Sequence, residues 1–173
     1  MTTPEKVLLL GMMGAGKTSV GGALGNRLGW PYIDNDAVLE RTSGHTAKAL
    51  LAEEGEAALR AAESKVLTFM LGMPAPMVGG VPAGVVLDES DRRRLASSPA
   101  HVVWLRVSPK VLARRLGSGA DRPWLGDDPE ATLRRLGAER NPFFEEVADQ
   151  VLDVDALAVG QIARLIAEEL AAP

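Results

Sequence analysis

A short apolar run that ends in a glycine-rich loop constrains this chain more strongly than any other feature. The run KVLLLG (6–11) leads directly into GMMGAGKT, from Gly11 to Thr18, which reads G-x-x-x-x-G-K-[ST]. In such a loop the backbone N–H groups turn inward on a phosphate, and the following helix adds the positive end of its dipole. The motif requires a buried strand before it and a helix after it. Both are predicted here, because apolar residues recur at helical spacing over 17–28.

The same loop predicts which residues hold a nucleotide. Lys17 suits the β- and γ-phosphates of ATP, and the Thr18 hydroxyl suits Mg²⁺. The expected phosphate-binding residues are Gly14, Ala15, Gly16, Lys17, Thr18 and Ser19. ATP and Mg²⁺ are therefore the predicted cofactors.

Strands and helices alternate along the rest of the chain, which predicts a parallel sheet with helices on both faces. Further strands are expected at 30–34, 76–81 and 101–107, and helices at 46–71, 89–96, 109–116, 129–147 and 159–171. With 173 residues and 46% hydrophobic content, the chain can bury a substantial core. We expect a single α/β domain over 1–173, in three layers, with about five parallel strands.

Charge and composition argue against several kinds of partner and site. Asp and Glu number 23 against 19 Lys and Arg, and the net charge of -4 offers no global positive field for a nucleic acid. The absence of cysteine and the presence of only 2 histidines argue against disulfides and against thiolate or histidine metal sites. The start, MTTPEKVLLLG, reads neither as a signal peptide nor as a membrane span. We expect a soluble, cytoplasmic monomer.

Other short motifs separate the classes of phosphate-binding-loop proteins. We find neither the N-K-x-D motif of regulatory GTPases nor the L-S-G-G signature of ABC ATPases. Thr18 and Ser19 follow the loop lysine, where adenylate-kinase-like enzymes usually have glycine. A small-molecule kinase remains, in which an acceptor hydroxyl attacks the γ-phosphate. We interpret GSGADRPWLGDDP (117–129) as its lid, because the segment is long and polar and carries Arg122 beside a proline. A surface connection without a function is the alternative.

Four segments after the loop resemble the successive motifs of the shikimate kinase family. They are IDNDAVLE (33–40), GEAALRAAE (55–63), DRPWL (121–125) and ERNPFFEEVAD (139–149), in the family's order and at nearly its spacing. The resemblance implies a three-layer P-loop kinase fold over most of the chain. It also implies that Asp34 holds Mg²⁺ through water, and that Asp36 binds the acceptor hydroxyl and helps to remove its proton. A solvated turn that uses both carboxylates for its own backbone is the alternative.

Arginines account for the rest of the implied site. By the resemblance, Arg60 and Arg140 face the acceptor's carboxylate, which guanidinium forks suit well. The alternative for Arg60 is a pair of helix-surface ion pairs with Glu56 and Glu63. Arg122 resembles the arginine that closes over the transferring phosphate. Arg115 resembles the one that packs against adenine, although Arg114 could exchange roles with it.

The pattern departs from the family at the acceptor pocket. Shikimate kinases usually have a triple glycine after the third strand, where this chain reads MVGGVPAGVV (77–86). We expect Gly79 and Gly80 to bind the acceptor, with Val81 or Gly84 in third place. In the other register the motif is Pro82-Ala83-Gly84, and the proline removes an N–H.

Two aromatic positions of the family are also changed, to Leu51 and Leu59. The pocket should therefore be more aliphatic. Trp124 either refills the space from the lid or packs the lid onto the body.

These patterns together predict an ATP- and Mg²⁺-dependent kinase that transfers the γ-phosphoryl group to the 3-hydroxyl of shikimate. The retained arginines indicate a carboxylate acceptor, so a kinase for a related cyclitol or a sugar acid such as gluconate is a first rival. A nucleotide-binding regulator that has lost catalysis is a rival of another class.

Overall fold

A parallel sheet of five strands forms the middle layer of the protein, in the order β2-β3-β1-β4-β5. The computed structural model describes residues 4–117 and 125–172. The strands are β1 (Lys6–Leu10), β2 (Tyr32–Ile33), β3 (Met77–Gly80), β4 (His101–Arg106) and β5 (Gln150–Asp153). In the described part, the helices are α1 (Lys17–Leu28), α2 (Asn35–Ser43), α3 (Ala47–Glu54), α4 (Glu56–Gly72), α5 (Glu89–Ala96), α6 (Pro109–Leu116), α7 (Pro129–Val147) and α8 (Val159–Leu170), with a 3-10 turn η1 (Ala83–Leu87). The expected fold class, a three-layer α/β fold with a parallel sheet, is confirmed.

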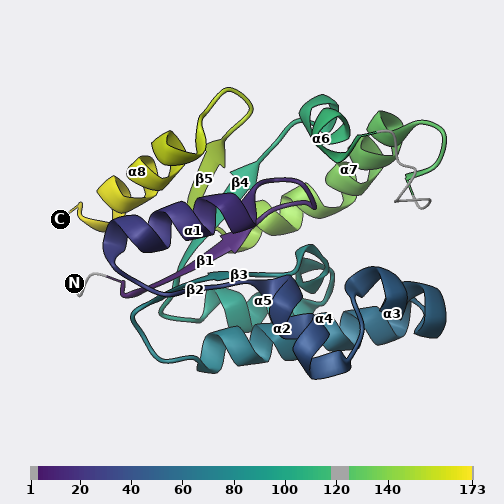
Figure 1. Ribbon diagram of the computed structural model, residues 1–173, viewed down its shortest axis with the longest axis horizontal. Coiled ribbons are helices and arrows are strands. Elements are labelled where there is room, and N and C mark those ends of the chain that lie inside the picture. Colours follow the sequence, from purple (N-terminus) through teal and green to yellow (C-terminus); the bar gives the residue numbers. More distant parts are fainter. Residues whose placement is uncertain (1–3, 118–124, 173) are drawn as a thin grey trace.

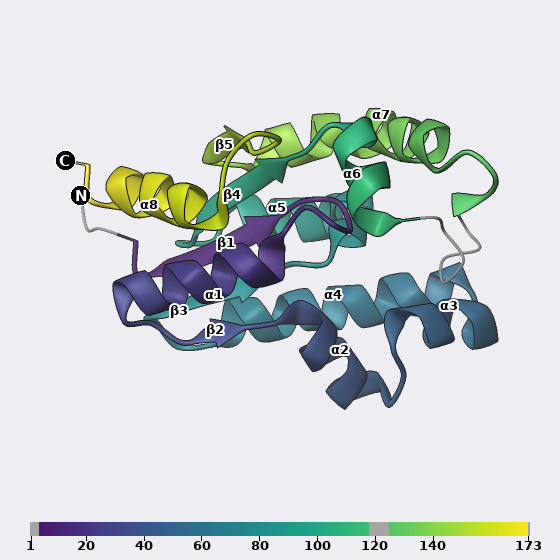
Figure 2. The same cartoon turned by 45° about the horizontal axis from the view of Figure 1, so that its top comes forward.

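Two hydrophobic cores lie on the two faces of the sheet. Successive side chains of β1 alternate between them, since Val7 and Leu9 belong to one core and Leu8 and Leu10 to the other. The first core packs under α1 and α8, which lie side by side in Figures 1 and 2. The second, larger core packs under α4, α5 and α7. A strand that is buried on both faces explains the unbroken apolar run KVLLL.

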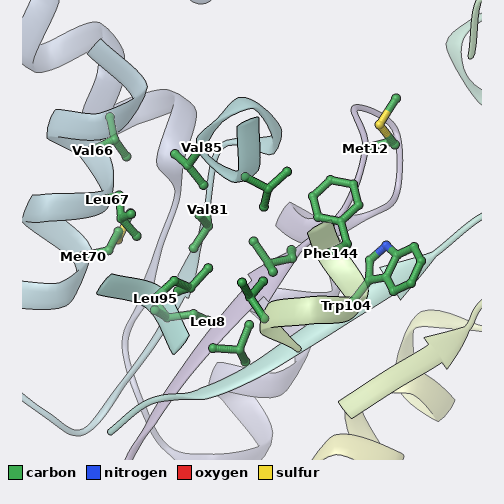
Figure 3. Close-up of a cluster of buried hydrophobic side chains, with 14 of the residues drawn as sticks. Leu8, Met12, Val66, Leu67, Met70, Val81, Val85, Leu95, Trp104 and Phe144 are labelled. Carbon is green, nitrogen blue, oxygen red and sulfur yellow. The ribbon is translucent and has the colours of Figure 1, made fainter. Parts of the chain in front are cut away.

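The larger core extends to the segment that follows β3. Figure 3 shows Val81 and Val85 beside Val66 and Leu67 of α4, with Trp104 and Phe144 on the other side. The ring centroids of Trp104 and Phe144 are 5.6 Å apart. Val81 is fully buried. Its side chain therefore serves packing and is not available to a ligand.

The sequence predicted most elements but missed three. Helix α2 was not expected, and the strand expected at 30–34 is shorter, because Asp34 caps α2 and ends the extended segment. Strand β5 is a four-residue edge strand with alternating half-buried and exposed residues, so its apolar signal is weak. The 3-10 turn η1 was also missed. Within the described residues, no helix combines the length and the apolar character needed to cross a bilayer.

Glycine at position 21 lets the β2 side chain Tyr32 approach α1. A methyl group on Gly21 would lie 2.1 Å from Cε2 of Tyr32, whereas one on Gly22 would meet nothing within 4 Å. Gly21 therefore admits a close neighbour that a larger residue would exclude.

We predict opposite effects of alanine at these adjacent positions. Gly21→Ala should destabilise the protein by about 1–3 kcal/mol, because the methyl overpacks against the tyrosine ring. Gly22→Ala should leave stability unchanged or raise it by up to about 1 kcal/mol, because alanine is the better helix former. Urea unfolding of both variants provides the measurement. Equal effects at the two positions would contradict this packing.

Candidate active site at the carboxyl edge of the sheet

The carboxyl ends of parallel strands meet at one edge of the sheet, and the loops that carry the site leave from this edge. Figures 1 and 2 show the loop between β1 and α1 at the same end of the molecule as α2, α3 and α6, far from both termini. Two adjoining cavities open there, of about 480 Å³ and 570 Å³. Among the described residues they share four lining residues, which are Met12, Lys17, Asn35 and Asp36. The shared wall is the natural meeting point of two bound molecules.

The smaller cavity is built around the glycine-rich loop. Its lining includes every residue predicted to hold phosphate, from Gly14 to Ser19. Gly14 and Gly16 have φ angles of 83° and 99°, a left-handed conformation that glycine adopts without strain. Arg115 also lines this cavity, and its Nη1 donates hydrogen bonds to the carbonyls of Gly14 at 3.1 Å and Ala15 at 3.2 Å. Arg114 is not among the lining residues, so the geometry favours Arg115 for the nucleotide side.

Lys17 projects from the first turn of α1 to the boundary of the two cavities. Its Nζ donates a hydrogen bond of 2.7 Å to the carbonyl of Gly11. Desolvation lowers the pKa of Lys17 to about 8, although the negative charges of Asp36 and Glu63 act in the opposite direction. An incoming phosphate would add negative charge beside this ammonium group and favour its protonated form.

Asp34 uses both carboxylate oxygens. Its Oδ1 accepts from the backbone N–H groups of Asp36 at 2.9 Å and Ala37 at 3.1 Å, which caps α2. Its Oδ2 accepts from the hydroxyls of Thr18 at 2.8 Å and Tyr32 at 3.2 Å. Desolvation raises the pKa of Asp34, but these four hydrogen bonds together bring it below its ordinary value. The carboxylate therefore stays ionised, with oxygen atoms from Asp34 and Thr18 side by side.

Asp36 lies on the shared wall of the two cavities. It belongs to the first turn of α2, so a helix holds it. Desolvation and the nearby charge of Asp34 raise the pKa of Asp36, whereas Lys17 lowers it. Its Oδ1 accepts a hydrogen bond of 3.0 Å from Nδ2 of Asn35. The structure thus brings a hydrogen-bond acceptor of raised proton affinity next to the phosphate-binding lysine.

The larger cavity contains the two predicted arginines. Arg60 of α4 and Arg140 of α7 both line it. The Nε atoms of both are buried and, among the described residues, have no hydrogen-bond partner. Desolvation and the positive charge of Arg60 lower the pKa of Arg140. A bound carboxylate would offset the repulsion between the two arginines, because it supplies negative charge.

Glu63 is a site residue that the sequence reasoning missed. Its Oε2 accepts a hydrogen bond of 2.6 Å from Nη1 of Arg60, and the side chain is only 10% exposed and lines the larger cavity. Desolvation raises the pKa of Glu63, while the charges of Arg60, Arg140 and Lys17 lower it. The i,i+3 spacing predicted the pair with Arg60, but on the helix surface. Leu59 and Leu67, four residues on either side and both buried, mark the same face of α4 and could have indicated its burial.

Gly79 and Gly80 are predicted to contact the acceptor, and this stays a prediction. Both are buried in β3, and neither is among the described residues that line the larger cavity. Pro82 and Ala83 line it in their place. The reason is the strand itself, which continues its pairing as far as Gly80, so the chain reaches the cavity two residues later.

Gly84 is not among the described lining residues, but it leaves space for the Arg60–Glu63 ion pair. A methyl group at Gly84 would lie 2.0 Å from both Arg60 Nη1 and Glu63 Oε2. The structure therefore favours the Pro82-Ala83-Gly84 register, in which the glycine makes room for the ion pair.

The remaining predictions concern the pocket's size and its cover. Leu51 and Leu59 both line the larger cavity, as the aliphatic substitutions indicated. Arg122 and Trp124 lie outside the described residues, as does most of the segment expected to form the lid. At its described end, Leu125 is fully buried, and its carbonyl accepts a hydrogen bond of 2.8 Å from the Thr132 hydroxyl.

Comparison with known proteins agrees with this arrangement. A family model described as shikimate kinase matches residues 13–171. A shikimate kinase of Halorhodospira halophila is 37% identical over 169 residues, covering 97% of this chain and 94% of the relative. A shikimate kinase of Thermobifida fusca is 37% identical over 172 residues, covering 99% of this chain and 98% of the relative. A solved structure of shikimate kinase from Acinetobacter baumannii in complex with shikimate matches with a TM-score of 0.89 and 30% identity, over 98% of this chain and 93% of that one. This chain belongs to the shikimate kinase family.

Proposed function

We propose that this protein transfers the γ-phosphoryl group of ATP to the 3-hydroxyl of shikimate. One observation carries the proposal. A cavity built on a phosphate-binding loop adjoins a cavity that is lined by Arg60 and Arg140 among others, and Lys17 and Asp36 line both. Phosphoryl transfer depends mainly on positioning and on neutralisation of charge, which this wall supplies from both sides.

The acceptor's two functional groups fit opposite parts of the larger cavity. The guanidinium groups of Arg60 and Arg140, which both line this cavity, suit the carboxylate. Asp36 suits the hydroxyl that reacts. In the transfer step the hydroxyl oxygen bonds to the γ-phosphorus, the bond to the β,γ-bridging oxygen breaks, and ADP leaves. We propose that Asp36 orients the hydroxyl and accepts its proton, and that Lys17 and Arg122 stabilise the charge on the transferring group.

Thr18 and Asp34 suit Mg²⁺. Their oxygen atoms lie 2.8 Å apart beside the phosphate-binding loop, and hard oxygen ligands are those that Mg²⁺ prefers. Within the described residues, no group of three or more His, Cys, Asp or Glu side chains forms a metal cage. This fits an ion that keeps several waters and binds largely through the nucleotide's phosphates. When bound, Mg²⁺ would neutralise charge on the β- and γ-phosphates, with Thr18 as a direct ligand and Asp34 holding it through water.

We also propose that the protein works as a monomer in the cytoplasm. Lys17, Asp36, Arg60 and Arg140 come together within one copy of the chain, which supports a site formed by a monomer. The absence of cysteine suits a reducing compartment.

Acceptor choice tests the proposal most simply. In an assay that couples ADP release to NADH oxidation, shikimate should be phosphorylated, and quinate and gluconate should be much poorer acceptors. Pro82 and Ala83 line the larger cavity where the family usually has glycines. This difference is the reason to test a related acid as the rival acceptor. ATP binding without turnover of shikimate would overturn the proposal. ATP binding without turnover of any of the three acids would favour a regulator.

Replacing Asp36 should separate transfer from nucleotide binding. Asp36→Asn keeps the shape of the side chain but removes its charge and proton affinity, so kcat should fall by about 100-fold or more. The Kd for MgATP should remain within about two-fold, because phosphate contacts come from the loop. Titration calorimetry with a non-hydrolysable ATP analogue measures the second quantity. A large loss of ATP affinity would mean that Asp36 does not act on the acceptor.

Replacing Arg60 should affect the acceptor rather than ATP. Arg60→Ala removes a charge-assisted contact to the carboxylate, so the KM for shikimate should rise by about 10-fold or more while the KM for ATP changes little. Arg93→Ala is a matched control, because Arg93 forms an ion pair of the same i,i+4 spacing with Glu89 on exposed α5. In Arg93→Ala, the KM for shikimate and the KM for ATP should both remain those of the wild type. Equal rises in the two KM values for Arg60→Ala would contradict the assignment.

A further inference from the structure

Among the described residues, four polar or charged side chains are buried, and three of them have evident partners elsewhere. Lys6 donates to three carbonyls at the end of α4, Glu63 pairs with Arg60, and Asp91 accepts from Ser64 and Arg94. The fourth is Asn35, only 6% exposed, which lines both cavities. Its place on the shared wall calls for a functional explanation.

The contact of Asn35 with Asp36 does not follow from helical spacing. Consecutive residues on a helix point about 100° apart, and side chains at i and i+1 do not normally face each other. Nδ2 of Asn35 nevertheless donates to Oδ1 of Asp36 at 3.0 Å. Within the described residues, no other side chain donates a hydrogen bond to this carboxylate. Its orientation in the free protein therefore depends on Asn35.

Gly80 provides the surface against which the Asn35 amide packs. A methyl group on Gly80 would lie 2.4 Å from Oδ1 of Asn35 and 3.3 Å from the hydroxyl of Tyr32. Any side chain at the end of β3 would therefore displace the amide. This close approach gives Gly80 a role in the site although it does not line the larger cavity.

We propose that Asn35 is a positioning residue for phosphoryl transfer. Held against Gly80, its amide occupies Oδ1 of Asp36 and fixes the plane of the carboxylate, which leaves Oδ2 to accept the hydrogen bond of the acceptor hydroxyl. The inference rests on the proposed function, because it concerns how Asp36 meets the acceptor. Small losses of alignment at a reacting group are costly, since a displacement of about 1 Å can reduce a rate about 100-fold.

The first test replaces the amide. Asn35→Ala should lower kcat by about 10- to 100-fold, the range typical when the support of a reactive group is removed. The Kd for MgATP should stay within about two-fold of the wild type. Asn35→Asp keeps the volume but loses the amide donor, and it should lower kcat at least as far. Asn35→Asp also tests the proposal if the alanine variant does not fold.

Ser64→Ala is the matched control. It also removes one hydrogen-bond donor from a carboxylate, that of Asp91, which is 5% exposed and lies between α4 and α5 outside both cavities. Its melting temperature should fall, but its kcat should remain that of the wild type. If Asn35 had only a structural role, Asn35→Ala would likewise lower the melting temperature and leave kcat unchanged. If Asn35→Ala loses melting temperature but keeps kcat within about three-fold, the inference is wrong.

The second test uses Gly80. Gly80→Ala should lower both kcat and the melting temperature, because the methyl displaces the Asn35 amide. In the Asn35→Ala background, where the space is free, the same change should have a clearly smaller effect on both. Additive losses would contradict the packing of Asn35 on Gly80. Failure of the wild type to phosphorylate any acid would overturn the proposed function itself, whereas a fully active Asn35→Ala enzyme would overturn only the inference.

Discussion

The two oxygens of the Asp34 carboxylate connect the nucleotide side of the molecule to the acceptor side. Oδ1 caps α2 and so fixes where that helix begins, and Oδ2 holds the hydroxyl of Thr18 at the start of α1. One side chain therefore sets the distance between the phosphate-binding loop and the helix that carries Asn35 and Asp36. Because β2 and β1 are held in one sheet on either side of β3, this connection rests on a rigid base. Lys17 and Asp36 meet on the shared wall as a consequence.

In the larger cavity, the charges of the buried arginines are only partly neutralised. Arg60 and Arg140 place positive charge in a desolvated space, and Glu63 between them offsets part of it without occupying their Nε donors. Burying like charges is costly unless a partner is supplied. The remaining positive charge should therefore favour binding of an anion such as a carboxylate. Leu51, Leu59 and Pro82 add apolar surface to the cavity's lining, which also includes the polar side chains of Lys48, Thr132 and Arg135.

Local chemistry could be predicted from the sequence, and long-range placement could not. The phosphate-binding loop with Lys17 and Thr18 is recognisable because backbone geometry demands those residue types in that order. Glu63 was missed because ion-pair spacing is the same on exposed and buried helix faces. Two registers stayed open after β3, because the length of strand pairing decides which residue reaches the cavity. Helix α2 was missed because Asp34, which caps it, was assigned to a longer strand.

The proposed transfer requires one acceptor that spans the cavity from Arg60 and Arg140 to Asp36, beside a nucleotide on the glycine-rich loop. A crystal structure with shikimate and a non-hydrolysable ATP analogue tests this most directly. We expect the shikimate carboxylate within hydrogen-bond distance of Arg60 and Arg140, and its 3-hydroxyl on Oδ2 of Asp36, facing the γ-phosphate. A carboxylate bound away from both arginines, or a 3-hydroxyl that does not contact Asp36, would contradict it.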